Sequence, residues 1–340
     1  MITGSENPGR MPATLRRNLS LILVVISLGW LCLDAPGPFL REAYFVLLML
    51  ALTVVTRSVS WRLAVLAVST GIGVAAPLMV AIGWLLARAG FDVSESELGS
   101  WGVVPFLEEL VKLAPVAFIA WMYRRKTKLT LNPSDWLVVG CAAGAGFAMV
   151  ENAQLVGSDP GVLRDMAEQY GPTWLVPGAW GAAGFVGHAA ATGFAAAGVG
   201  LSRALGREAA ARGASRVPGR VALAAPFAWV TLEHVLANLR VSTGSTAALL
   251  LGNGRLTPWL FVVVVALIVY RDYDLARRAL AHSKILRVRR ALAREALLGT
   301  RLPTRRTPWQ RALVAAGELR LVNAAAWCTL ERLVTGGTAK

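Results

Sequence analysis

The feature that most constrains the fold is a series of apolar stretches, each close to the length that an α-helix needs to cross a bilayer. They lie at about residues 18–33, 43–56, 63–87, 101–123, 135–156, 174–201, 221–241 and 257–270. The chain is 55% hydrophobic and only 16% charged, which an ordinary soluble domain is not. The sequence therefore predicts an all-α, polytopic membrane bundle of about eight transmembrane helices.

Basic residues divide the predicted loops into two sets. Arginine and lysine precede the first stretch and follow the second, fourth and sixth, whereas the loops after the third and fifth are acidic or nearly neutral. Because basic loops stay on the cytoplasmic side, both termini are predicted to be cytoplasmic in a cell-membrane protein. Asn132 to Asp135 have the residue types that begin a helix, so they are expected to start the fifth span.

The C-terminal tail is strongly basic. Residues 271–340 contain 15 Lys and Arg against five Asp and Glu, so they carry +10 of the chain's net charge of +15. Apolar residues recur with helical spacing at 275–298 and again at 309–334. Such arginine-rich amphipathic helices are typical of a membrane surface, so the expected partner of the tail is anionic lipid and not nucleic acid.

Several ionisable residues lie inside the predicted spans, where each costs about 2.5 to 3.5 kcal/mol on insertion scales. Counting 1.5 Å per residue from the expected span ends puts Glu109, Glu151 and His234 about 7 to 12 Å below the outer surface, and His188 roughly 15 Å below it. Four helices would thus bring these groups to one layer in the outer half of the bilayer. Groups of this kind face a partner or a water-filled cavity.

Helical spacing refines this layer. Glu108 and Lys112 are four residues apart, so the lysine is expected to neutralise Glu108, while Glu109 is turned about 100° away and faces the other helices. Asn238 follows His234 by one turn and could orient its imidazole. Glycines in the fifth and sixth spans would let the helices approach closely around these side chains.

Two hydrolytic mechanisms are compatible with two histidines and several glutamates. The residues could bind Zn²⁺, which lowers the pKa of a bound water, with a remaining glutamate as general base. Alternatively, a glutamate alone could activate water while histidine and asparagine stabilise the oxyanion. The spacing is not that of an H-E-x-x-H helix, so ligands would come from different helices.

Four stretches carry a resemblance to a known family. EELVK at 108–112, GFAMVEN at 146–152, GHAAATG at 187–193 and HVLAN at 234–238 resemble, in this order, the motifs of the PrsW family of intramembrane proteases, a branch of the wider group that contains the CAAX prenyl proteases. The similarity covers about residues 100–240, with the first three spans and the tail outside it. Asn238 stands where PrsW proteins often have Asp, as in the CAAX-type relatives, and Glu233 matches no motif.

The resemblance implies roles for eight residues. Those with catalytic roles are Glu108, Glu109, Glu151, His188 and His234; those in support are Lys112, Asn152 and Asn238; and the metal set would be Glu151, His188 and His234. Together, the spans, the motifs and the basic tail predict four regions: membrane helices 1 to 3 at 1–100, a catalytic core at 101–241, the last membrane helix at 242–270 and the basic cytoplasmic tail at 271–340. The implied substrate is a membrane-anchored protein, such as an anti-sigma factor.

The sequence thus predicts a metal-assisted or glutamate-type intramembrane endopeptidase with its site in the outer half of the bilayer. Two other classes compete with this prediction. A proton-coupled transporter also concentrates Glu, His and Lys at mid-membrane, but it favours inverted repeats and interrupted helices, which the sequence lacks. A non-catalytic scaffold would retain the basic tail but would not need every acidic and histidine residue of the four motifs.

Overall fold

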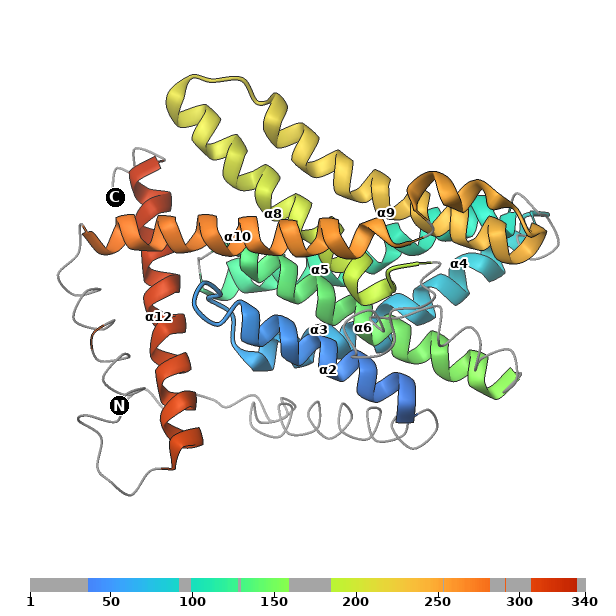
Figure 1. Ribbon diagram of the computed structural model, residues 1–340, viewed down its shortest axis with the longest axis horizontal. Coiled ribbons are helices and arrows are strands. Elements are labelled where there is room, and N and C mark those ends of the chain that lie inside the picture. Colours follow the sequence, from blue (N-terminus) through green and yellow to red (C-terminus); the bar gives the residue numbers. More distant parts are fainter. Residues whose placement is uncertain are drawn as a thin grey trace, which may run out of the picture.

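The structure, a computed structural model, describes residues 36–91, 99–127, 130–158, 185–252, 254–281, 291 and 307–334. These residues form a bundle of helices (Figure 1). In chain order the elements are α2 (Pro36–Leu52), α3 (Trp61–Thr70), η1 (Gly71–Ala75), α4 (Ala76–Arg88), η2 (Gly99–Val103), α5 (Val104–Thr127), α6 (Pro133–Ser158), α8 (His188–Arg212), α9 (Val217–Thr243), η4 (Thr246–Leu251), α10 (Leu256–Ala281) and α12 (Pro308–Val334).

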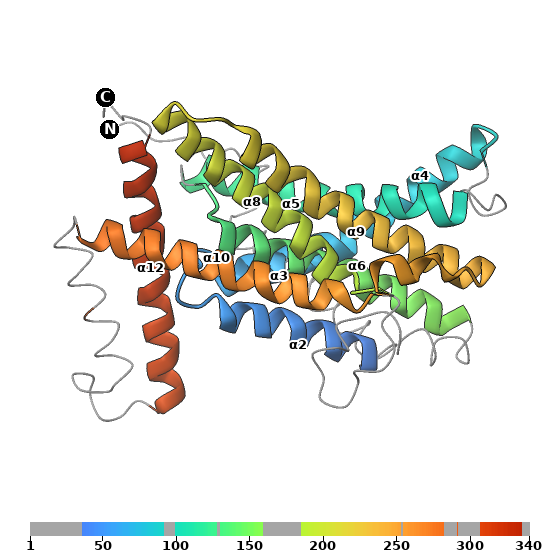
Figure 2. The same cartoon turned by 45° about the horizontal axis from the view of Figure 1, so that its top comes forward.

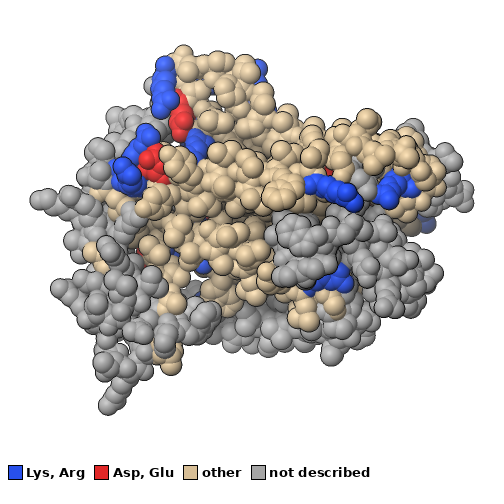
Figure 3. All heavy atoms as spheres, in the orientation of Figure 1, with Lys and Arg blue, Asp and Glu red and all other residues tan. Residues whose placement is uncertain are grey.

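The predicted fold class, an all-α membrane bundle, is confirmed. Within the described residues, four helical stretches are long and apolar enough to cross a membrane, at Trp61–Arg88, Pro133–Gln154, Val217–Thr243 and Leu249–Leu280. The face in Figure 3 carries its charged side chains mainly towards the two ends of the bundle, with an uncharged band between them. That distribution suits a protein whose middle lies in hydrocarbon.

Each expected span from 43–56 onward coincides with a helix, although some ends differ; the first, 18–33, lies outside the described residues. The second span was placed several residues too late, because α2 begins at Pro36 and includes Arg41 and Glu42. Proline suits the first turn of a helix, and Glu42 is buried against the bundle. The pair of charged residues therefore lies inside the helix and does not precede it.

Helix α6 is the centre of the bundle. It contacts α2, α3, α5 and α8 and is buried along nearly its whole length; Figure 2 shows it behind α8 and above α2. The closest approaches use its glycines, as predicted: a Cβ at Gly146 would lie 2.0 Å from the Val68 carbonyl oxygen, and one at Gly144 2.3 Å from that of His188. No larger residue fits at either position without moving the neighbouring backbone.

The start of α8 corrects the expected sixth span. A helix was expected from 174 to 201, with His188 well inside it; among the described residues the helix begins at His188 and continues to Arg212. Gly187 has φ +89°, which places it in the left-handed half of the backbone map and interrupts the helix. The count of 1.5 Å per residue that gave His188 a depth of roughly 15 Å therefore does not apply, because His188 is the first residue of α8 and follows an extended segment.

The N-terminus of α6 is fixed by a polar cluster, which confirms that Asn132 to Asp135 cap this helix. The Asp135 carboxylate accepts hydrogen bonds from the backbone N–H groups of Ser58 (2.6 Å), Val59 (3.0 Å) and Asn132 (3.2 Å), and from the Ser58 hydroxyl. Asn132 Oδ1 accepts in return from the Asp135 N–H. The loop between α2 and α3 is thereby bound to the start of α6.

Helix α12 lies across one end of the bundle, roughly perpendicular to α10 (Figures 1 and 2), and corresponds to the helix expected at 309–334. It packs on α10 through a small apolar cluster that includes Ala279, Leu280, Val322 and Ala326. Asn323 Nδ2 donates to the Arg57 carbonyl oxygen at 3.2 Å. Most of the other expected tail helix, at 275–298, lies outside the described residues. We call this end of the molecule the α12 end.

Candidate active site

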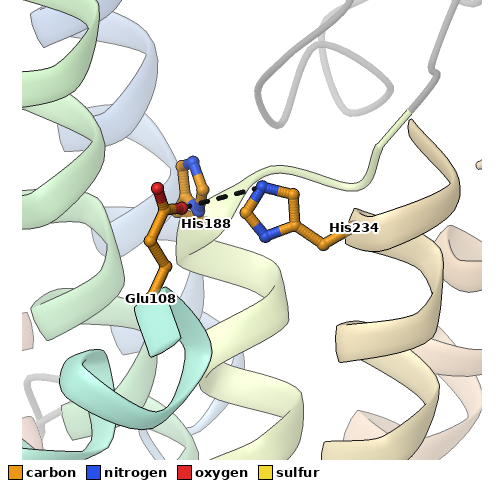
Figure 4. A group of neighbouring side chains, drawn as sticks. All are labelled: Glu108, His188 and His234. Atoms are coloured by element: carbon orange, nitrogen blue, oxygen red, sulfur yellow. Dashed lines mark ion pairs between the residues drawn. The ribbon is translucent and has the colours of Figure 1, made fainter. Parts of the chain in front are cut away.

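Four helices meet at the opposite end from α12, and each contributes ionisable side chains. Glu108, Glu109 and Lys112 lie in the first three turns of α5, Glu151 lies near the end of α6, His188 begins α8, and His234 lies in the second half of α9. The helices alternate in direction, so these distant sequence positions come to one level. Figure 4 shows Glu108, His188 and His234 directed towards one another.

Lys112 connects two of these helices. Its ammonium nitrogen donates to Glu109 Oε1 at 2.6 Å and lies 2.5 Å from His188 Nδ1, and the side chains of both Lys112 and Glu109 are 0% exposed. The expected pairing of Lys112 with Glu108 is therefore wrong. Residues three and four positions apart are both neighbours on a helix, and Glu109 is the neighbour on the side from which His188 approaches.

The contacts of Lys112 fix the tautomer of His188. An ammonium group has no acceptor, so Nδ1 must be the accepting nitrogen and Nε2 must carry the proton. Nε2 in turn lies 2.5 Å from Glu151 Oε2, to which it donates. The Phe147 ring meets the imidazole edge to face, with ring centroids 5.2 Å apart. Both nitrogens of His188 are thus engaged within the site.

His234 is oriented by Glu109. Its Nδ1 lies 3.0 Å from Glu109 Oε1, and since a carboxylate only accepts, Nδ1 donates and Nε2 carries the lone pair. The ring of Phe185 stacks on the imidazole with centroids 4.5 Å apart and 22° between the planes. The contact that sets the tautomer therefore comes from Glu109. The role predicted for the half-buried Asn238, one turn further along α9, stays a prediction.

Glu108 faces the lone pair of His234. Its Oε2 lies 3.7 Å from His234 Nε2 (Figure 4), is buried, and has no hydrogen-bond partner within the described part of the chain. Two acceptor atoms that face each other in a buried site repel unless a cation or a proton lies between them. This arrangement therefore needs either a bound metal ion or a proton on Glu108 or on His234 Nε2.

The residues at this point fit a divalent metal. Ligand atoms of Glu108, His188 and His234 all lie within 4.8 Å of one another, and the three residues are buried. Two imidazoles and a carboxylate are the donor set of many catalytic zinc sites, which keep a further position open for water. The predicted metal set contained Glu151 in place of Glu108. The structure instead places Glu151 beside His188, with 32% of its side chain exposed.

Two residues that contact or border the site escaped sequence analysis. Phe185, which stacks on His234, lies three residues before His188 in a stretch that had been assigned to a helix, so nothing marked its ring as a contact of the site. Glu233 was treated as a secondary polar residue, yet its carboxylate is buried and accepts from the Thr257 hydroxyl. Asn152, expected in support, is buried next to Glu151.

Comparison with known proteins yields one match. The sequence model of the PrsW family intramembrane metalloproteases matches residues 59–270, and no curated protein and no solved structure matches the chain. The match is wider than the 100–240 region in which the motifs were recognised. It includes α3 and α4, so the third expected span does not lie outside the family region, and it extends through the first half of α10.

Proposed function

The chain belongs to the PrsW family of intramembrane metalloproteases, and from this premise we propose that it hydrolyses a peptide bond of a membrane-anchored protein at the centre formed by Glu108, His188 and His234. The observation that carries the proposal is the buried approach of these three side chains from three helices, with ligand atoms within 4.8 Å of one another. Side chains that served only in helix packing would not place unpaired hydrogen-bond acceptors opposite each other in a buried site.

We propose Zn²⁺ as the cofactor, with these three residues as its ligands. When bound, the ion would supply a Lewis acid and a water that is acidic enough to act near neutral pH. Glu109 keeps the proton of His234 on Nδ1, so that Nε2 presents its lone pair to the centre. Lys112 balances the charge of Glu109 and prevents that carboxylate from taking the place of Glu108.

Glu151 is the candidate general base. To act as a ligand through Nε2, the neutral imidazole of His188 would have to carry its proton on Nδ1 instead, so its contacts with Glu151 and with Lys112 would both have to change. Glu151 would accept a proton from the attacking water and return it to the leaving amine nitrogen, which completes hydrolysis without net proton transfer.

The orientation of the chain supports a substrate cleaved near the extracytoplasmic surface. The arginines of the loops after the second, fourth and sixth spans lie at the α12 end, and the candidate site lies at the other end. By the positive-inside rule the α12 end and both termini would be cytoplasmic. We therefore propose a substrate with an extracytoplasmic segment beside its membrane anchor, of which an anti-sigma factor is one example.

Comparative membrane proteomics tests the proposed reaction. Cells that produce Glu108→Gln or His234→Ala should accumulate full-length forms of one or more membrane-anchored proteins that the wild type cleaves. Glu208→Gln is the control, because it makes the same change as Glu108→Gln at a carboxylate that pairs with Arg271 at 2.5 Å and lies far along α8, away from the site. Identical membrane-protein fragments in wild type and both site variants would refute proteolysis.

Elemental analysis of the purified protein separates the two mechanisms. We expect about one zinc per chain in wild type prepared without chelators, and little in His188→Ala or His234→Ala. Zinc-free wild type that still cleaves substrate would instead support a protonated Glu108 and a glutamate mechanism.

A further inference from the structure

Glu233 is a buried carboxylate beside the site that none of the four motifs includes. It lies one residue before His234 in α9 and is 2% exposed. The Thr257 hydroxyl of α10 donates to it, and the indole Nε1 of Trp229 donates to the same hydroxyl oxygen at 2.8 Å. A carboxylate at this position is costly in a membrane protein, so its contacts need an explanation beyond helix packing.

A second contact of Glu233 leads into the site. The backbone N–H of Val186 donates to its carboxylate. Val186 belongs to the extended segment 185–187, which runs past His234 to the start of α8 (Figure 4). Residues outside a helix have no helical hydrogen bonds for their backbone groups, and Val186 is fully buried. Glu233 therefore supplies a partner that this segment needs.

The extended segment touches both histidines of the site. On one side of Val186, Phe185 stacks on His234 and approaches the His188 ring, with centroids 5.2 Å apart. On the other side, Gly187 leads directly into His188, the first residue of α8. A shift of Val186 would consequently move the ring that covers one imidazole and the backbone that carries the other.

We infer that Glu233 is a positioning residue of the candidate active site: by holding the Val186 N–H, it fixes the segment that places Phe185 against His234 and sets the start of α8 at His188. This inference rests on the proposed function for its catalytic consequence. The alternative is that Glu233 only joins α9 to α10 through Thr257. The two contacts can be separated, because Thr257→Val removes the α10 contact and leaves the carboxylate available to Val186.

The catalytic test compares three substitutions at constant protein level. Glu233→Leu should lower kcat for a cleaved substrate by about 10- to 100-fold, as is usual when a partner that orients a site histidine is lost. Glu233→Gln should retain most of the activity, because its amide oxygen can accept the same hydrogen bonds. Thr257→Val should resemble Glu233→Gln. Equal losses in Glu233→Leu and Thr257→Val would show that Glu233 acts through α10 and would overturn the inference.

A second test does not depend on proteolysis. Val186→Cys, made in a chain in which Cys32 and Cys328 are replaced by serine, places a thiol in the buried segment; Cys141 is itself buried and can remain. Glu233→Leu should accelerate labelling of this thiol by a water-soluble reagent on the order of tenfold or more, because the segment loses a buried backbone partner. Glu233→Gln should not.

The two tests fail in different ways. Unchanged labelling in Glu233→Leu would overturn the positioning role whatever the enzyme does. If Glu233→Leu accelerates labelling but the Glu108→Gln variant still processes substrates normally, the positioning role of Glu233 stands and the proposed reaction is refuted.

Discussion

Lys112→Met offers the most direct test of the charge balance in the site. Methionine keeps the unbranched shape of the side chain and removes the ammonium group, so Glu109 loses its 2.6 Å ion pair in a place where both side chains are 0% exposed. Removing one partner of a buried ion pair costs about 3–5 kcal/mol. Glu109 keeps His234 at 3.0 Å, so we expect about 3 kcal/mol, at the lower end of that range.

The assay is the free energy of unfolding in mixed micelles, measured by titration with a denaturing detergent. Arg278→Met is the matched control, because Arg278 also pairs with a carboxylate at 2.6 Å, that of Asp274, but its side chain is 65% exposed. An exposed pair contributes about 0–1 kcal/mol, so this control should unfold nearly as the wild type does.

Double variants identify the carboxylate that Lys112 neutralises. If the structure is correct, adding Glu109→Gln to Lys112→Met should recover stability, because no uncompensated charge then remains. If Glu108→Gln recovers the stability of Lys112→Met and Glu109→Gln does not, Lys112 pairs with Glu108, as helical spacing alone had suggested. A Lys112→Met variant as stable as Arg278→Met would refute the whole argument, since Lys112 would then not compensate a buried charge.

Two further substitutions test the packing that brings the site together. Gly144→Ala should abolish most activity, because the new Cβ would lie 2.3 Å from the His188 carbonyl oxygen, whereas Gly83→Ala, with no atom within 4 Å of its Cβ, should be neutral in both activity and thermal unfolding. Asp135→Ala should lower the free energy of unfolding by about 3 kcal/mol or more, since three backbone N–H groups lose their acceptor; a loss comparable to that of Asp274→Ala would contradict the assigned role.

The spans, and the common level of the ionisable residues within them, could be predicted from the sequence because both follow from the properties of the bilayer. Hydrocarbon excludes charge, so long apolar stretches had to be helices, and the few ionisable residues inside them stood out. The cap of α6 was equally local, since the side chain of each of Asn132 and Asp135 accepts a hydrogen bond from the backbone N–H of the other, one turn away. These features depend on neighbours within the same helix or on the membrane itself.

The particular pairs of residues that meet between helices were not predictable. Helical spacing allowed Lys112 to pair with either glutamate, and the choice follows from His188, which arrives from another helix. The start of α8 was hidden because the residues before it are as apolar as the helix itself, and only the φ of Gly187 reveals the break. The grouping of Glu108, and not Glu151, with His188 and His234 as possible metal ligands likewise depends on how three different helices meet.

Helix α6 links the two ends of the molecule. At its start, Asp135 holds the loop before α3; in its middle, Gly146 lies against the Val68 carbonyl and Gly144 against that of His188; near its end, Glu151 meets the imidazole of His188. A helix with a partner at each of these levels cannot shift along its axis without breaking contacts at both ends. The polar cluster at the α12 end therefore serves the site indirectly, because it fixes the register in which α6 presents Glu151 to α8.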